Sequence, residues 1–372
     1  MLIVYKLKFI KMSYLKKLLA FFLIFNLTFV TTAQATTTFV RSFDVSLLNN
    51  DPVGIVFNNN GSKMYLTDVN NNHIETYNLT TPFNLATAND ALEIHTVGGG
   101  MLFGVAFNTL GSVLYYYNLA ENNVIQVNLT TNFDVSAGVN NGACDTAPEI
   151  DTGGEITFNT DGSKMFIMDR DLGDDVNEYS LGLPFDLTTC NFTRSFSVIN
   201  EIGNHIEADA PGIAFNADGT KMFIAGRVDS TESRVWEYIL STAFDVSTAS
   251  FADSINVTNQ DNQPQGISFN NDGTKMFVTG SENDNVYEYI LTTSFDLNLA
   301  DSDADSAADE SSEATLPDPT TDKYVVGLID TQSQLIKSFM LNSIGSISNR
   351  LSNTRCELPQ DRLKSKTELC IN

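Results

Sequence analysis

Large and polar residues alternate along the chain in a unit of about fifty residues. The unit is clearest over residues 266–297, where three short β-favouring runs, GISF, KMFVTG and NVYEYIL, are separated by polar segments. The first separation is Asn-Asn-Asp-Gly, a turn in which glycine accepts the positive φ of a tight hairpin. A fourth strand is predicted after a Phe-Asp-Leu corner, as in FADSINV at 251–257. Each unit is therefore predicted to be a meander of four antiparallel strands.

Five copies of the unit follow from the phenylalanine that ends its first strand. This residue recurs at Phe57, Phe107, Phe158, Phe215 and Phe269, with spacings of 50, 51, 57 and 54 residues. A four-stranded unit of this length cannot bury both of its faces alone, and repeats of this kind are typical of the blades of a β-propeller. The fold class is therefore predicted to be all-β, with the copies arranged as blades in a ring.

Segments at both ends of the repeats predict a sixth blade. FVRSFDV (39–45) looks like a fourth strand without its first three, and residues 314–327 align without gaps on 266–279. Residues 335–341 would add a third strand to that last copy. Because joining the ends removes exposed sheet edges, we predict a six-bladed β-propeller over residues 36–341, closed by pairing of the N- and C-terminal strands.

One strand of the fifth copy departs from the pattern. LADSDAD at 299–305 stands where the fourth copy has FADSINV, so two inward positions become aspartates. Two interpretations stay open: a damaged outer strand, or an acidic loop over residues 301–313.

The first hairpin turn carries a family resemblance. Three copies read Asp-Gly-Ser/Thr-Lys, beginning at Asp161, Asp218 and Asp272. In this the chain resembles the bacterial β-propeller repeats of the YVTN, NHL and lactonase-like groups. The resemblance implies an architecture rather than an activity. Its lactonase-like members imply one alternative function, a metal-dependent hydrolase with a divalent cation at the central channel.

The N-terminal segment of the chain predicts export. Residues 6–17 are basic, residues 18–30 are almost wholly apolar, and Ala-Gln-Ala follows at 33–35, so residues 1–35 are predicted to be a secretory signal peptide. The apolar run is shorter than the ~20 residues that a membrane anchor needs. We expect a periplasmic, extracellular or cell-surface protein with no stable membrane span after cleavage. NSIGSISNRLS at 342–352, which opens the polar tail 342–372, faintly resembles the segment before an autotransporter barrel. This resemblance adds a degenerate autotransporter passenger as a third alternative.

Net charge limits the possible partners, and the cysteine count limits the possible disulfides. The chain has 46 acidic and 21 basic residues, a net charge of −25, which argues against a nucleic-acid partner because a phosphate backbone requires a basic surface. The four cysteines are too few for a disulfide scaffold. Cys144 and Cys190 are expected near opposite ends of the third blade and are not expected to pair, whereas Cys356 and Cys370 could close a loop in the tail.

A paired substitution predicts a contact inside each blade. Four copies place a lysine at the start of the second strand and a glutamate in the third, whereas the second copy has Val113 and Gln126 and loses both charges together. We infer a lysine–glutamate contact on neighbouring strands rather than a ring of catalytic carboxylates. The residues are Lys63, Lys164, Lys221 and Lys275, with Glu75, Glu178, Glu237 and Glu288.

No motif supports catalysis: the sequence has no nucleophile elbow, no HExxH and no phosphate-binding glycine loop. The loops that join strand four to strand one and strand two to strand three are acidic, notably at 169–175 and 201–209. We therefore expect a secreted binding or scaffolding module whose acidic loop face contacts a protein, glycan or small molecule.

One position of the innermost strand breaks the repeat. It is glycine in four copies (Gly54, Gly104, Gly212 and Gly266) but glutamate in the third, Glu155. Glu155 is interpreted either as a solvated rim side chain or as a ligand on the central axis. In the second case the candidate metal ligands are Glu155, Asp151, His205 and Asp209, and the cofactor would be a divalent cation such as calcium.

Overall fold

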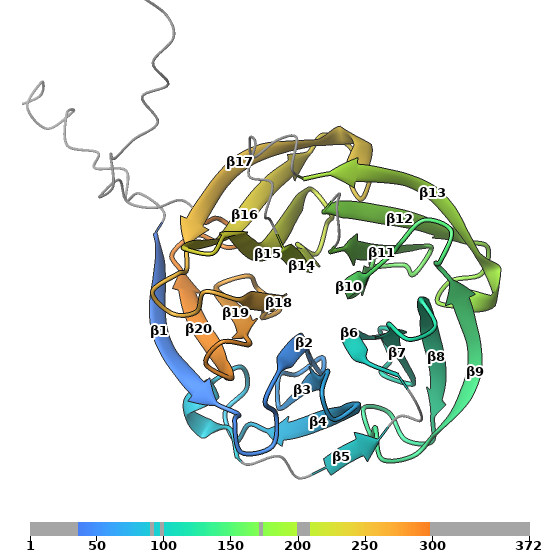
Figure 1. Cartoon of the computed structure of the whole chain (residues 1–372), viewed down its shortest axis with the longest axis horizontal. Coiled ribbons are helices and arrows are strands. Elements are labelled where there is room, and N and C mark those ends of the chain that lie inside the picture. The colour runs from blue at the N-terminus through green and yellow to red at the C-terminus, as the bar shows by residue number, and fades with distance from the viewer. Residues whose placement is uncertain (1–35, 90–92, 97–99, 171–173, 199–208, 298–372) are drawn as a thin grey trace, which may run out of the picture. The chain divides into compact units, whose positions relative to one another are not determined.

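The chain folds into five four-stranded antiparallel sheets arranged around a central axis (Figure 1). The computed structural model describes residues 36–89, 93–96, 100–170, 174–198 and 209–297. Within these ranges, no helix is long and apolar enough to cross a membrane. The prediction of an all-β propeller with four-stranded blades is confirmed.

The strands follow one another outward from the axis in each blade. The first blade contains β2 (Pro52–Phe57), β3 (Lys63–Asp68), β4 (His73–Asn78) and β5 (Glu93–Thr96), and the second contains β6 (Leu102–Phe107), β7 (Val113–Asn118), β8 (Asn123–Leu129) and β9 (Gly138–Asp145). The third contains β10 (Gly153–Phe158), β11 (Lys164–Asp169), β12 (Asp175–Leu181) and β13 (Cys190–Ser197). The fourth contains β14 (Asp209–Phe215), β15 (Lys221–Asp229), β16 (Glu232–Leu240) and β17 (Ala249–Asn256). The fifth contains β18 (Pro264–Phe269), β19 (Lys275–Gly280), β20 (Asn285–Leu291) and β1 (Thr37–Asp44).

The prediction of six blades is wrong, because the N-terminal strand belongs to the fifth blade. β1 pairs antiparallel with β20, from Thr37 opposite Leu291 to Asp44 opposite Asn285, and Figure 1 shows the two strands side by side. The predicted partner of β1, residues 335–341, lies outside the described residues, as do 299–305 and the rest of the proposed sixth copy. β1 keeps the alternating large residues that the 299–305 segment lacks, which suits it to the outer position.

The first hairpin turn of each blade is held by the aromatic corner that follows the third strand. Gly273 has φ +70°, and a Cβ there would lie 2.1 Å from the ring of Phe295. Glycine is therefore required twice over, by its backbone conformation and by the aromatic ring packed on it. Phe295 itself has φ 52°, and the same glycine–phenylalanine pair occurs in all five blades. Three of the corners continue into single-turn 3-10 helices, η1 (Leu85–Thr87), η2 (Leu187–Thr189) and η3 (Val246–Thr248).

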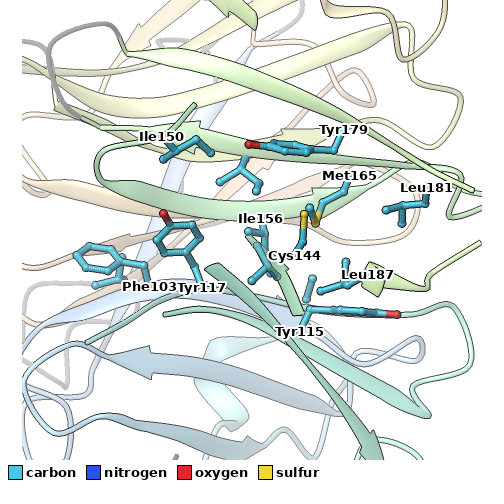
Figure 2. Packing of buried hydrophobic residues seen from close by; sticks show 14 of the residues in the cluster. Phe103, Tyr115, Tyr117, Cys144, Ile150, Ile156, Met165, Tyr179, Leu181 and Leu187 are labelled. Carbon is cyan, nitrogen blue, oxygen red and sulfur yellow. The ribbon is translucent and has the colours of Figure 1, made fainter. Parts of the chain in front are cut away.

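The core lies between neighbouring blades. Figure 2 shows the side chains that fill the space between the second and third blades, including Tyr117, Ile156 and Met165. A disulfide joins Cys144 of β9 to Cys190 of β13, with Cα atoms 6.0 Å apart. The expectation that these cysteines would not pair is wrong. It treated both as parts of the third blade, whereas Cys144 lies on the outer strand of the second.

The lysine–glutamate contacts are confirmed in three blades. The Nζ–Oε1 distances are 2.8 Å for Lys164–Glu178, 2.6 Å for Lys221–Glu237 and 2.8 Å for Lys275–Glu288. The three glutamates are nearly fully buried, at 1–3% exposure. A buried carboxylate needs such a partner, because desolvation alone would make its charge costly.

Each of these pairs also binds the aromatic corner of the next blade. Lys275 Nζ donates to the carbonyl of Phe83, 2.6 Å away, and Glu288 Oε2 accepts from the Leu85 amide at 3.1 Å. The second blade makes the same two contacts without charge. Tyr115 donates its hydroxyl to the Phe185 carbonyl, and Gln126 accepts from the Leu187 amide. The paired loss of charge in the second copy therefore preserves both contacts with the neighbouring blade.

The predicted Lys63–Glu75 pair of the first blade is wrong by one residue. The strand register places Thr76 opposite Tyr65, where the other blades place Glu178, Glu237 and Glu288. Lys63 Nζ instead donates to the carbonyl of Phe133 at 3.3 Å. Successive side chains of a strand point to opposite faces, so Glu75 lies on the other face of its blade, beside the fifth blade rather than the second.

Candidate functional site

The innermost strands β2, β6, β10, β14 and β18 surround the axis (Figure 1). Each has a strand neighbour on only one side, so its other backbone edge faces the axis and offers N–H and C=O groups. The strands approach very closely: a Cβ on Gly104 would lie 2.5 Å from the Ile156 amide nitrogen of the next blade. The repeated glycine is therefore needed for this approach.

A funnel of about 400 Å³ opens along the axis. It is lined by the ends of the inner strands and by the first hairpin turns of all five blades, so it opens on the face opposite the acidic loops. Small or short side chains recur two positions after the repeated glycine, namely Val56, Ala106, Thr157, Ala214 and Ser268. The sequence carries this signal as a second regular column of small or short residues, two positions after the glycines.

The rim of the funnel is joined from blade to blade by side chains of the hairpin turns. Asn59 Nδ2 donates to the Thr109 carbonyl at 2.7 Å, and Asn271 Nδ2 donates to the Asn59 carbonyl at 2.7 Å. Thr160 Oγ1 donates to the Ala217 carbonyl at 2.8 Å. These bonds connect blades one and two, five and one, and three and four, so the rim is a preformed structure.

Glu155 forms the floor of the funnel. The strand register aligns it with the glycines of the other blades, and its side chain is 3% exposed. Oε1 accepts from the Val105 amide at 3.0 Å, and Oε2 accepts from the Ile55 amide at 3.3 Å. The carboxyl group therefore reaches across the axis and ties β10 to β6 and β2.

Burial dominates the electrostatics of this carboxyl group. Desolvation raises the pKa of Glu155 from 4.5 to about 8, and the backbone amides of Val105, Ile55 and Ile156 only partly oppose it by favouring the charged form. Glu155 is therefore mainly protonated and uncharged at pH 7. It is also the only ionisable side chain among the described residues that line the funnel.

The four predicted metal ligands are only partly described. Asp151 is exposed, Glu155 is buried on the axis, and His205 and the side chain of Asp209 lie outside the described residues. The oxygens of Glu155 accept hydrogen bonds from amide N–H groups, whose partial positive charge is unfavourable beside a cation. The calcium or other divalent cation expected at this set remains a prediction.

The comparisons with known proteins are confined to fold-level similarity. No protein-family model and no curated protein matches the sequence. Among solved structures, a β-propeller domain from Myceliophteria thermophila is 10% identical and covers 69% of this chain and 100% of its own, with a TM-score of 0.41. The periplasmic gluconolactonase of Pseudomonas aeruginosa is 11% identical and covers 64% of this chain and 66% of its own, with a TM-score of 0.41. A luciferin-regenerating enzyme is 10% identical and covers 70% and 97%, with a TM-score of 0.42. Similarities this weak say nothing about ligand or reaction.

The opposite face carries carboxylates that repel one another. Burial, and then the charge of Asp68, raise the pKa of Asp51, which Arg170 partly opposes. Burial, and then the charge of Asp261, raise the pKa of Asp284. Like charges held this close favour a cationic partner over an anionic one. The expected contact role of this acidic face remains a prediction.

Proposed function

We propose that this propeller is a binding module that holds a small, uncharged, hydroxyl-rich molecule, such as a mono- or disaccharide, in the axial funnel. The observation that carries the proposal is the composition of the lining. Five backbone edges and the side chains of Thr157, Ser268 and Asn271 offer both donors and acceptors, while the single ionisable lining group, Glu155, is uncharged at neutral pH. The volume of about 400 Å³ falls within the usual range of small-molecule sites.

The lining disfavours charged ligands. A sugar acid would face Glu155 without a basic lining residue, and an amine would lose its hydration without a carboxylate to replace it. A neutral polyol exchanges its hydrogen bonds with water for bonds to backbone groups that are already held in place by the ring. Pre-organised groups of this kind reduce the entropic cost of binding.

The experiment measures the melting temperature and the binding heat with matched panels of neutral sugars, sugar acids and amino sugars. A ligand that binds only the native state raises its stability, so at least one neutral sugar is expected to raise Tm while its charged counterparts do not. Thr157→Tyr fills the funnel and should abolish the shift. Thr193→Tyr makes the same change on the exposed outer strand β13 and should leave the shift intact.

Two results would overturn the proposal. One is a neutral panel without any shift at millimolar concentration. The other is a shift that persists unchanged in Thr157→Tyr, which would place the sugar elsewhere. Because the pKa of Glu155 is about 8, affinity for a sugar in contact with its acid proton should also weaken as pH rises above 8.

A further inference from the structure

A second group of chemically active side chains lies away from the funnel, between the first and fifth blades. Asp68 ends β3, His73 begins β4, and the two residues face each other in the strand register. Glu75 and Tyr77 follow His73 at alternate positions of β4, on the side that packs against Phe43 and Val286 of the fifth blade. The pairing of β3 with β4 therefore brings two carboxylates and one imidazole to a single point.

The three side chains are buried and converge closely. Asp68 and Glu75 are both 0% exposed, and His73 is 8% exposed. His73 Nε2 lies 2.7 Å from Glu75 Oε1 and 3.9 Å from Asp68 Oδ2. One ligand atom from each residue lies within 4.8 Å of the other two. Two donors that share one ion at about 2.0–2.2 Å lie at most about 4.4 Å apart, and both distances from His73 Nε2 satisfy this limit.

The blade architecture does not need a carboxylate at this place. The residues that occupy the register position of Glu75 in the other blades are Ile125, Asn177, Trp236 and Tyr287. The strand thus accepts neutral side chains here, several of them large and apolar. Glu75 replaces one of them with a fully buried carboxyl group, whose desolvation must be offset by hydrogen bonds or by a nearby cation.

Hydrogen bonds from neighbouring residues also fix the orientation of the two carboxylates. The Tyr77 hydroxyl donates to Glu75 Oε2 at 2.6 Å. The backbone N–H groups of Asn70 and Asn71 donate to Asp68 Oδ1 at 2.8 and 3.0 Å. Glu75 thereby leaves Oε1 directed toward His73, whereas Asp68 Oδ2 faces His73 and also accepts a hydrogen bond from Asn71 Nδ2 at 2.7 Å. Hydrogen bonds to the outer oxygen of a ligating carboxylate are the usual support of a metal site.

The balance of charge requires more than the imidazole. Asp51 and Asp284 add negative charge around Asp68, and Asp284 Oδ1 is buried without a hydrogen-bond partner among the described atoms. Arg170 offsets part of this charge at Asp51, and a divalent ion beside His73 would supply two further positive charges. The nitrogen donor favours Zn²⁺ or a similar transition metal over Ca²⁺ or Mg²⁺, which take oxygen ligands.

We propose that Asp68, His73 and Glu75 form a binding site for a divalent transition-metal ion, with Zn²⁺ as the preferred occupant. The ion lies between the first and fifth blades, beside the strand that completes the ring. This site is separate from the residues that line the funnel, and the proposal does not depend on sugar binding there.

The experiment uses the full chain, stripped with a chelator and titrated with Zn²⁺ in the presence of excess Mg²⁺ and Ca²⁺. One equivalent of Zn²⁺ should bind, and Co²⁺ in its place should give the visible absorption bands of a low-symmetry site. His73→Gln and Glu75→Gln should each lower Zn²⁺ affinity by about 100-fold or more. Tyr77→Phe, which removes the hydroxyl that supports Glu75, should lower it by about 10-fold. Glu121→Gln removes an exposed carboxylate and should bind as wild type does.

Three results would overturn the proposal. Absence of stoichiometric Zn²⁺ binding in the presence of Mg²⁺ would identify the cluster as a metal-free ion triad. An unchanged Co²⁺ spectrum in both His73→Gln and Glu75→Gln would place the ion elsewhere. If those variants fail to fold, Tyr77→Phe decides, because unaltered affinity in that folded variant contradicts ligation by Glu75.

Discussion

Glu155→Gln tests how the buried axial carboxyl group affects stability. The wild-type side chain has a pKa of about 8 in the folded protein and an ordinary value of 4.5, which is the value expected in the unfolded chain. Between these two pH values the folded state holds a proton that the unfolded state releases. The free energy of unfolding contributed by Glu155 is therefore fully present below pH 4.5 and is lost as pH rises toward 8.

The magnitude follows from the two pKa values. Each pH unit between them is worth about 1.4 kcal/mol, so the full loss amounts to about 5 kcal/mol. The physical cause is desolvation of the carboxylate on the axis, which three backbone amides do not fully offset. Glutamine does not ionise, so the Glu155→Gln variant lacks this pH-dependent loss.

The assay is urea unfolding of wild type and Glu155→Gln from pH 4.5 to pH 8.5. Other groups titrate in both proteins, so the informative quantity is the difference between the two unfolding free energies at each pH. This difference should change in favour of the variant by about 5 kcal/mol from pH 4.5 to pH 8. Glu121→Gln, which alters an exposed carboxylate, should show almost no trend.

A flat difference between wild type and Glu155→Gln would refute this reasoning. It would mean that Glu155 ionises in the folded protein near its ordinary pKa, either because water reaches the axis or because a bound cation compensates the charge. Repeating the series with added Ca²⁺, Zn²⁺ or Mn²⁺ separates these two causes. Only a cation bound at Glu155 would stabilise wild type and leave the variant unaffected.

Three further perturbations test contacts between blades. Cys190→Ser opens the disulfide that closes a loop of 46 residues and should lower the free energy of unfolding in urea by about 4 kcal/mol. A free thiol at Cys190 in the unfolded, unreduced protein would contradict the bond. Lys221→Met leaves Glu237 buried without its lysine and should lower the free energy of unfolding by about 3–5 kcal/mol. Lys63→Met, at a position with no glutamate in register, should lower it by about 1 kcal/mol or less. Equal losses in the two variants would rule out a buried charge pair. Deletion of residues 36–46 uncovers the edge of β20 and should lower the free energy of unfolding by at least about 4 kcal/mol, with self-association visible by size-exclusion chromatography. A monomer of unchanged stability would show that β1 is dispensable.

Most of the blade could be predicted from sequence because its causes are local. The alternation of large and polar residues defines the strands, and the hairpin glycine is needed within its own blade for both its φ and its contact with the corner phenylalanine. The place of Glu155 in the inner strand also followed from the repeat alone. That it accepts hydrogen bonds from Ile55 and Val105 depends on how the blades meet at the axis.

Contacts between blades could not be predicted from a single repeat. Pairing of Cys144 with Cys190 depends on the blade to which each outer strand belongs. The first-blade error had a different cause: Glu75 and Thr76 are adjacent in sequence but face different neighbouring blades, so a shift of one residue changes every partner. Only the strand register showed that Glu75 joins Asp68 and His73.

The number of blades is the clearest division between sequence and tertiary structure. The repeat identifies five copies, of which the fifth has a damaged outer strand or an acidic loop in its place, and an N-terminal strand without a blade of its own. The sequence assigned LADSDAD to the outer position of the fifth blade, either as a damaged strand or as an acidic loop, and FVRSFDV to a sixth blade. It did not show which segment pairs with the outer edge of β20. Tertiary structure decided it, because pairing β1 with β20 buries Val45 and part of Phe43 against the first and fifth blades, whereas the aspartates of the other segment would lie at inward positions. Competition between distant segments for one sheet edge is an energetic comparison that no local pattern contains.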